Sequence, residues 1–164
     1  MNNIYFNGDI DEQNVQVFIG NFNTLDHTQP INVYLNSQGG HLSEGQILRD
    51  VLETNGHAIT LIASGEISSA AFDVFFNSRV AVKRVLPDTF GMVHQGTYPA
   101  ALHENGHPTS DLYDIYKNQA INSYKKNILI LKKLGLTEDE LTRYKEGKNV
   151  YFSSKRLIQL LQNA

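Results

Sequence analysis

The chain contains no cysteine among its 164 residues. Disulfide bonds, thiolate nucleophiles and cysteine-based metal sites are therefore excluded. The absence of cysteine fits a reducing compartment, and we expect a cytoplasmic protein. No apolar run is long enough to span a bilayer, and residues 1–4 have neither the basic nor the apolar part of a signal peptide. We expect no membrane partner.

Clustered positive charge is also missing. The 14 lysines and arginines are dispersed and are outnumbered by 17 aspartates and glutamates, for a net charge of -3. Because nucleic acids are bound mainly through clustered cations, the charge pattern predicts no nucleic-acid partner. The sequence shows no internal repeat, low-complexity tract or linker. Its length suits one domain with a hydrophobic core, so we expect a single domain over residues 1–164.

What the sequence does contain is an alternation of β-type and helical patterns. Strands are expected at residues 4–6, 31–35, 59–63, 79–82, 90–94 and 150–152. Helices are expected at residues 11–25, 43–53, 70–76 and 110–134, and two short helices follow Thr137 and Ser153. Alternating strands and helices predict right-handed crossovers and a mostly parallel sheet in an α/β fold.

The segment Gly65-Glu66-Ile67-Ser68-Ser69 connects an apolar strand pattern to an apolar helix pattern. A serine at such a turn lies beside the free N–H groups and partial positive charge of a helix N-terminus. Both effects favour negative charge that develops next to the hydroxyl. The alternative is that Ser68 or Ser69 only caps the helix, which is the commoner role of an isolated Ser-Ser pair.

Two neighbouring motifs favour a serine hydrolase over a simple cap. Asn36-Ser37-Gln38-Gly39-Gly40 precedes the serine turn, and Met92-Val93-His94-Gln95 follows it. A serine hydroxyl becomes an effective nucleophile when a base, most often histidine, takes its proton. His94 is the expected base, because it ends a strand where ligands meet open α/β sheets.

Acyl transfer also needs two N–H donors held ready for an oxyanion. Gly39 or Gly40 is expected to supply one, because glycine lets the backbone approach a substrate closely. Ala70, directly after the expected nucleophile, would supply the other. Each motif has a plainer interpretation by itself: the glycine pair as a turn, and His94 as a buried core histidine. The three motifs in this order favour the hydrolase.

The remaining histidines give little support for a metal site. His103 and His107 are four residues apart, a spacing that binds metal when it falls on a helix. Gly106 and Pro108 argue against a helix there. We therefore expect neither a metal ion nor another cofactor.

Three motifs in order resemble the Clp protease proteolytic subunit family: Val33-Tyr34-Leu35-Asn36-Ser37-x-Gly39-Gly40, Gly65-x-Ile67-x-Ser69 and Met92-x-His94-Gln95. The resemblance covers residues 4 to about 161. It implies the ClpP/crotonase fold, a superhelix of β-β-α units with a protruding handle helix at residues 110–134. It also implies a serine peptidase that acts on peptides or unfolded proteins in homo-oligomeric rings, as a heptamer or as stacked rings.

By the same resemblance, Ser69 matches the nucleophile and His94 the base, and Gly40 and Ala70 match the oxyanion donors. Asn149, in Asn149-x-Tyr151-Phe152-Ser153, stands where the family has its catalytic aspartate. Asparagine can orient an imidazole but cannot offset its positive charge, and this exchange in a chymotrypsin-type triad costs about 10⁴ in turnover.

Other departures from the family concern the loop, the third catalytic group and the partners. Gln38 replaces a usual proline, and Asp139 or Glu146 could take over the role of the missing aspartate. The sequence starts at the first strand, without the family's N-terminal segment that helps to dock an ATPase ring. Partnership with a Clp ATPase is therefore left open.

Three functions remain open at this point. The first is a serine peptidase that uses Ser69 and His94 with the atypical Asn149. The second is a catalytically impaired or inactive ring subunit with a structural or regulatory role, for which Asn149 is the main argument. The third is an acyl-CoA enzyme of the crotonase type. Such sites usually use acidic residues, so the serine–histidine pair disfavours it.

Overall fold

A computed structural model describes residues 2–26, 28–54, 56–97 and 110–164. Contacts within the chain divide it into two compact units: unit 1, Met1–Val93 with Val150–Ala164, and unit 2, His94–Asn149. The single domain expected from the sequence remains a prediction. Each unit is described by itself.

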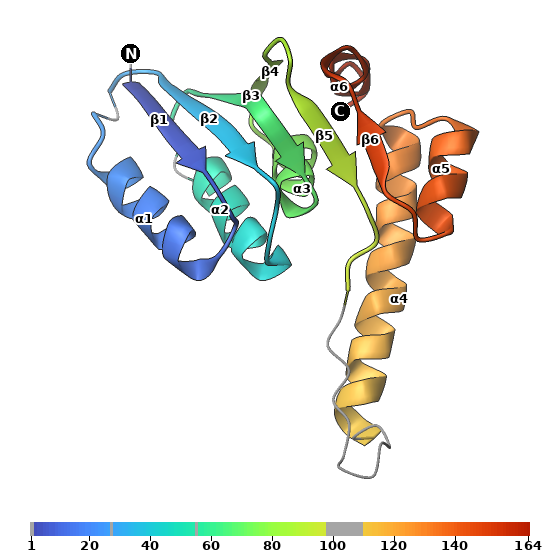
Figure 1. Cartoon of the computed structure of the whole chain (residues 1–164). Helices are drawn as coiled ribbons and strands as arrows, with labels where there is room; N and C mark the ends of the chain where they lie inside the picture. Colours follow the sequence, from blue (N-terminus) through green and yellow to red (C-terminus); the bar gives the residue numbers. More distant parts are fainter. Residues whose placement is uncertain (1, 27, 55, 98–109) are drawn as a thin grey trace. The chain divides into compact units, whose positions relative to one another are not determined.

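Unit 1 is built on a six-stranded sheet in the order β1-β2-β3-β5-β6, with β4 pairing with β3 outside this path (Figure 1). The strands are β1 (Asn2–Asn7), β2 (Ile31–Ser37), β3 (Ile59–Ser68), β4 (Val82–Val85), β5 (Phe90–Val93) and β6 (Val150–Phe152). All pairs are parallel except β5 with β6. The predicted α/β fold with a mostly parallel sheet is confirmed.

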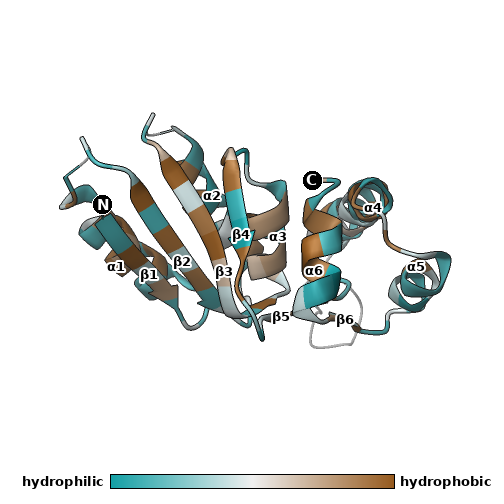
Figure 2. Cartoon of the chain, turned by 90° about the horizontal axis from the view of Figure 1, so that it is seen from above, coloured by the Kyte–Doolittle hydropathy of each residue, from teal (hydrophilic) through white to brown (hydrophobic). Residues whose placement is uncertain are grey.

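The helices of unit 1 agree with the sequence prediction to within two residues at their ends. They are α1 (Glu12–Asn23), α2 (Leu42–Thr54), α3 (Ala70–Asn77) and α6 (Ser154–Leu161). Helix α3 is largely apolar along its length (Figure 2), and Phe72 and Phe75 are buried. Arg49 of α2 pairs with Asp73 of α3 at 3.2 Å. Helix α3 thus holds the residue after the expected nucleophile in a packed core.

The fourth strand lies further along the chain than its sequence predicts. The expected strand ends at residue 82, where β4 begins. Its Lys83 side chain donates hydrogen bonds to the carbonyl oxygens of Phe76 and Ser78, at 3.2 and 2.6 Å, at the end of α3. These bonds and the pairing with β3 fix the position of the strand in the chain. A prediction from local β-propensity takes neither into account.

Lys83 should make stability depend on pH. Burial lowers the pKa of Lys83 from 10.5 to about 8, against an opposing effect of Glu53. Between these values the unfolded chain holds a proton that the folded chain has lost, so the free energy of unfolding rises with pH. We expect the free energy of unfolding of Lys83→Met to lose this rise with pH. Urea unfolding measured between about pH 8 and pH 10.5 tests this expectation. Lys155→Met, at an exposed position of α6, should keep the rise; the same pH dependence in Lys83→Met and wild type would contradict the account.

In the residues of unit 2 that the structure describes, the helices are α4 (Ser110–Lys133) and α5 (Glu138–Lys145). Helix α4 confirms the helix predicted at residues 110–134 to within one residue, and its role as a handle helix stays a prediction. The predicted capping box opens α5: Thr137 Oγ1 accepts from the Glu140 N–H, and the Glu140 carboxylate accepts from the Thr137 N–H. The rings of Tyr124 and Tyr144 stack with centroids 6.3 Å apart and join the two helices. In the described ranges, no helix has the length and hydropathy to cross a membrane.

Candidate active site

Ser69 occupies a strained turn between β3 and α3, with φ 54° and ψ -120°. Such a conformation costs a non-glycine residue about 1–3 kcal/mol and persists only where the surroundings enforce it. The Ser69 N–H donates to the Met92 carbonyl oxygen at 2.8 Å, which ties the turn to β5. A strained strand-to-helix turn is also the device that presents the nucleophilic serine in α/β-hydrolases.

The two adjacent serines have different surroundings. Ser69 is the N-cap residue of α3, but its side chain makes no capping hydrogen bond to the helix. The Ser69 side chain is partly exposed. Ser68 is fully buried, and its Oγ has no hydrogen-bond partner in the part of the chain that the structure describes. Only Ser69 therefore combines accessibility with a strained turn, and the plain capping role does not apply to it.

Gly39 approaches the serine turn so closely that a side chain has no room. A Cβ on Gly39 would lie 2.6 Å from the Ser69 Cβ and 2.7 Å from the Ser68 carbonyl oxygen, and the φ of Gly39 is +104°. The Gly39 N–H donates to Ser37 Oγ at 3.0 Å. The glycine loop therefore packs against Ser69, and the Gly39 N–H is used in a hydrogen bond within the loop.

Ile10 holds the glycine loop in place and was not among the predicted site residues. Its N–H donates to the Gly39 carbonyl oxygen and its own carbonyl accepts from the His41 N–H, both at 2.8 Å, so that Ile10 and Gly40 form a parallel bridge. Gln38, which replaces the family's proline, donates to Asp9 at 2.5 Å. The one sequence signal for this role was an isolated apolar residue between two aspartates.

Strand β3 runs to Ser68 instead of ending near residue 63 as predicted. It bends at Gly65, where φ is +73° and a Cβ would lie 2.7 Å from Asn36 Oδ1. Asn36 Oδ1 accepts from the Glu66 N–H at 3.0 Å, and the β2–β3 register shifts beside it. Asn36 therefore stabilises a bulge that re-aims β3 just before Ser69.

Gly39→Ala should damage the serine turn specifically. The added Cβ must displace either the loop or Ser69, so we expect labelling of Ser69 by a fluorophosphonate to slow by about 10-fold or more, with lost stability, because alanine is strained at positive φ. Gly56→Ala is the matched control: Gly56 has φ +72°, but nothing lies within 4 Å of its Cβ position. Equal labelling rates in the two variants would contradict this role for Gly39.

Three strand ends meet at one edge of the sheet of unit 1. Ser68, the last residue of β3, is paired with Met92 of β5. Val93, the last residue of β5, is paired with Val150, the first residue of β6. Because β3 and β5 are parallel and β6 is antiparallel, β3 and β5 end where β6 begins.

Each of the three expected catalytic residues is adjacent in the chain to one of these strand ends. Ser69 follows β3, His94 follows β5 and Asn149 precedes β6. His94 and Asn149 are the first and last residues of unit 2. Within unit 1 the register places the strand ends Ser68, Val93 and Val150 at one edge of the sheet, and the assembly of the three catalytic residues stays a prediction.

The two carboxylates considered as substitutes for aspartate, Asp139 and Glu146, both belong to unit 2, and that role stays a prediction for each. Glu146 pairs with Lys148 at 2.7 Å, and this hydrogen bond and charge lower the pKa of the Glu146 carboxyl. Asp139 belongs to the first turn of α5. In the described ranges, no group of three His, Cys, Asp or Glu could hold a metal ion. His103 and His107 lie outside those ranges.

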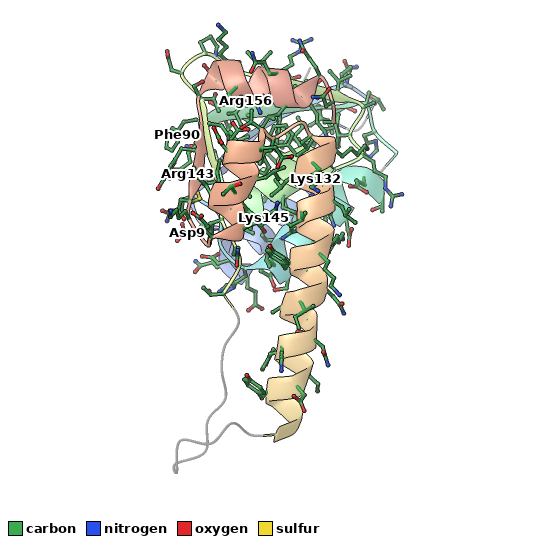
Figure 3. All side chains as sticks on the ribbon, turned by 90° about the vertical axis from the view of Figure 1, so that its right-hand side faces the viewer. Asp9, Phe90, Lys132, Arg143, Lys145 and Arg156 are labelled. Carbon is green, nitrogen blue, oxygen red and sulfur yellow. The ribbon has the colours of Figure 1, made fainter. Side chains whose placement is uncertain are left out.

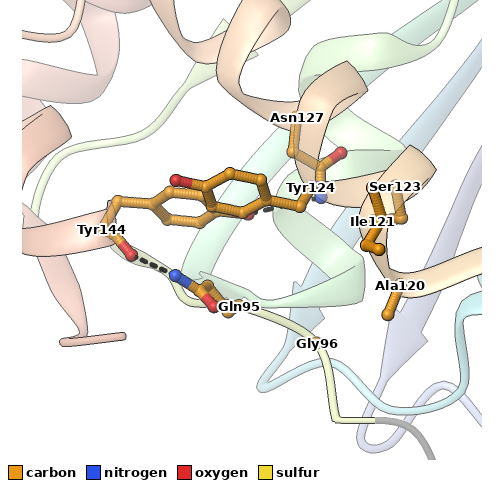
Figure 4. Close-up of a pocket in the computed structure, with 8 residues that line it drawn as sticks. All are labelled: Gln95, Gly96, Ala120, Ile121, Ser123, Tyr124, Asn127 and Tyr144. Carbon is orange, nitrogen blue, oxygen red and sulfur yellow. Dashed lines mark hydrogen bonds between the residues drawn. The ribbon is translucent and has the colours of Figure 1, made fainter. Parts of the chain in front are cut away.

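A pocket of about 250 Å³ lies within unit 2 and was not predicted (Figure 4). It is lined by Gln95, Gly96, Ala120, Ile121, Ser123, Tyr124, Asn127 and Tyr144. Gln95 Nε2 donates to the carbonyl oxygens of Tyr144 and Lys145, at 2.7 and 3.2 Å. Asn127 Nδ2 donates a hydrogen bond to the Tyr144 hydroxyl oxygen at 3.4 Å. The pocket wall is thus mainly apolar, and its Gln95 and Asn127 side chains are held by hydrogen bonds.

A mostly parallel α/β sheet with a strained serine beside a glycine loop is an architecture typical of serine hydrolases. A model of the Clp protease family matches residues 1–132. The chain therefore belongs to the Clp protease family, as its motifs predicted.

Among solved structures, the chain is similar to an asparagine-to-aspartate mutant of ClpP1 from Listeria monocytogenes. The TM-score is 0.67 and the sequence identity 18%, over 96% of this chain and 86% of that chain. At this identity the similarity establishes the fold and not the activity. Comparison with curated proteins gives no match.

Proposed function

We propose that the chain is a serine peptidase of the Clp type that cleaves peptides or unfolded polypeptides. The observation that carries the proposal is the strained turn of Ser69, a partly exposed residue whose side chain does not cap α3. A backbone strained at the end of a core strand costs stability, and such strain is concentrated at functional sites. A purely structural serine would need no such turn.

In the proposed reaction, Ser69 Oγ attacks the scissile carbonyl while the His94 imidazole takes the hydroxyl proton. The N–H groups of Gly40 and Ala70 hold the oxyanion of the tetrahedral intermediate. His94 then gives the proton to the leaving amine as the C–N bond breaks, and water hydrolyses the acyl-enzyme by the same route. Gly39 serves this site by leaving space, since its own N–H is engaged with Ser37.

The register of the sheet supports this assignment. Ser69, His94 and Asn149 each adjoin one of three strand ends that meet at one sheet edge. Covalent geometry keeps residues adjacent in the chain about 3.8 Å apart at Cα.

Asn149 is the proposed third member of the site. Its amide oxygen would orient the imidazole by a hydrogen bond, but it supplies no charge to stabilise the imidazolium. We therefore expect slow catalysis. The similar Listeria protein was solved as a mutant in which aspartate replaces an asparagine. Asn149 also favours the second candidate function, a catalytically impaired ring subunit with a structural or regulatory role.

We further propose that the chain assembles with copies of itself into a ring in the cytoplasm, heptameric or as stacked rings. Helix α4 exposes apolar side chains, among them Ile115 at 50% and Leu129 at 69% of their surface. Exposed apolar side chains along one helix indicate an interaction surface. A further copy of the chain is the proposed partner.

Hydrolysis of internally quenched peptides by the purified, assembled protein tests the function. Cleavage should occur within the peptides, and His94→Ala should slow it by about 10²–10⁴-fold, the usual contribution of a general base. His57→Ala, a histidine preceding β3, should leave the rate unchanged. Full activity in His94→Ala would overturn the proposed mechanism.

A further inference from the structure

Gln95 is singled out by its motif but has no part in the chemistry above. Its side-chain amide is nevertheless fastened: Nε2 donates to the carbonyl oxygens of Tyr144 and Lys145. Both carbonyls belong to the last turn of α5, where helical carbonyl groups lack intrahelical partners. The residue next to His94 is thus attached directly to the end of α5.

The same turn of α5 is attached to Asn149. Arg143 and Lys145 project from α5 (Figure 3), and Arg143 Nη2 donates to the Asn149 carbonyl oxygen at 3.3 Å. The Lys148 N–H donates back to the Arg143 carbonyl at 2.9 Å. The short segment between α5 and Asn149 is therefore fixed at both ends.

Helix α5, to which Gln95 and Asn149 are attached, is itself fixed to α4. The buried Tyr144 ring stacks on Tyr124 of α4, and its hydroxyl accepts from Asn127 Nδ2. Side chains that orient a functional group work best when packing locks them in turn. The Gln95 bond to the Tyr144 carbonyl ends on this anchored residue.

We propose that Gln95 is a positioning residue that sets the separation and angle between His94 and Asn149 through the end of α5. This inference rests on the proposed function. A carboxylate would attract an imidazolium over a range of geometries, whereas a neutral amide depends on a directed hydrogen bond. The tether therefore matters more with asparagine in the third position than with aspartate.

The test replaces Gln95 by methionine, which keeps the length of the side chain and removes its donor. We expect kcat for peptide hydrolysis to fall by about 10–100-fold with little change in KM, the effect of a misplaced catalytic group. In the Asn149→Asp background the same replacement should cost about fivefold less, since residues of one network couple. Gln13→Met, the same replacement at an exposed position of α1, should leave kcat unchanged.

Equal losses in both backgrounds, or an equal loss in Gln13→Met, would overturn the inference. A second readout does not depend on turnover: the His94 tautomer and pKa, from NMR of ¹⁵N-histidine-labelled protein carrying Ser69→Ala. Gln95→Met should change both, and unchanged His94 signals would overturn the positioning role. If wild type hydrolyses no peptide, the proposed function fails, and the NMR measurement still decides the role of Gln95.

Discussion

Replacing Asn149 by aspartate is expected to raise kcat/KM for peptide hydrolysis by about 10²–10⁴-fold, because the reverse change in a Ser-His-Asp protease costs about 10⁴. The carboxylate would stabilise the imidazolium that forms as His94 takes the serine proton. It would also select the tautomer of the imidazole that can accept that proton. The measurement is steady-state cleavage of one quenched peptide near neutral pH by both proteins.

The control for Asn149→Asp is Asn127→Asp, which adds the same charge to unit 2 at a position that lines the pocket. It should give no comparable gain. Asn149→Ala should be slower than wild type, since it removes the hydrogen-bond acceptor. A folded Asn149→Asp variant that gains nothing would contradict the assignment of Asn149 and favour the inactive ring subunit.

Ser69→Ala is expected to abolish peptide hydrolysis, with a loss of about 10³-fold or more, bounded by the slow wild-type rate. The variant removes only the nucleophilic oxygen. The neighbouring Ser68→Ala removes the same atom from a buried hydroxyl without a partner in the described ranges. Deleting an unpaired buried hydroxyl should leave activity intact and leave stability unchanged or raise it by about 1 kcal/mol.

The pair separates chemistry from packing, because the two serines are adjacent and the same atom is deleted from each. Thermal unfolding of both variants, measured beside their peptidase rates, completes the comparison. Activity that survives in Ser69→Ala, or that disappears only in Ser68→Ala, would mean that Ser69 is not the nucleophile.

The fold was largely predictable because the apolar pattern of each strand and helix is local. The alternation of β2 and the apolar helix after Ser69 both follow directly from the order of residues. The bulge at Gly65 does not, since it depends on a hydrogen bond between Asn36 and Glu66, 30 residues apart. The shift of β4 likewise depends on Lys83 reaching the end of α3.

The candidate site was predicted as a set of motifs, while its physical distinctions came from the structure. Sequence patterns could not separate Ser68 from Ser69, because the difference is burial and a backbone angle. They could not find Ile10, whose role is played by its backbone groups. Gly39 leaves room for the serine turn, and Gln95 is proposed to position His94. Both roles depend on neighbours that are distant in the chain.

The most direct test of the central claim is mass-spectrometric mapping of the residue that a fluorophosphonate modifies in the assembled protein. The account predicts one adduct, on Ser69, that is absent in Ser69→Ala and forms more slowly in His94→Ala. An adduct on Ser68 or on another residue, or no adduct on the folded ring, would contradict it.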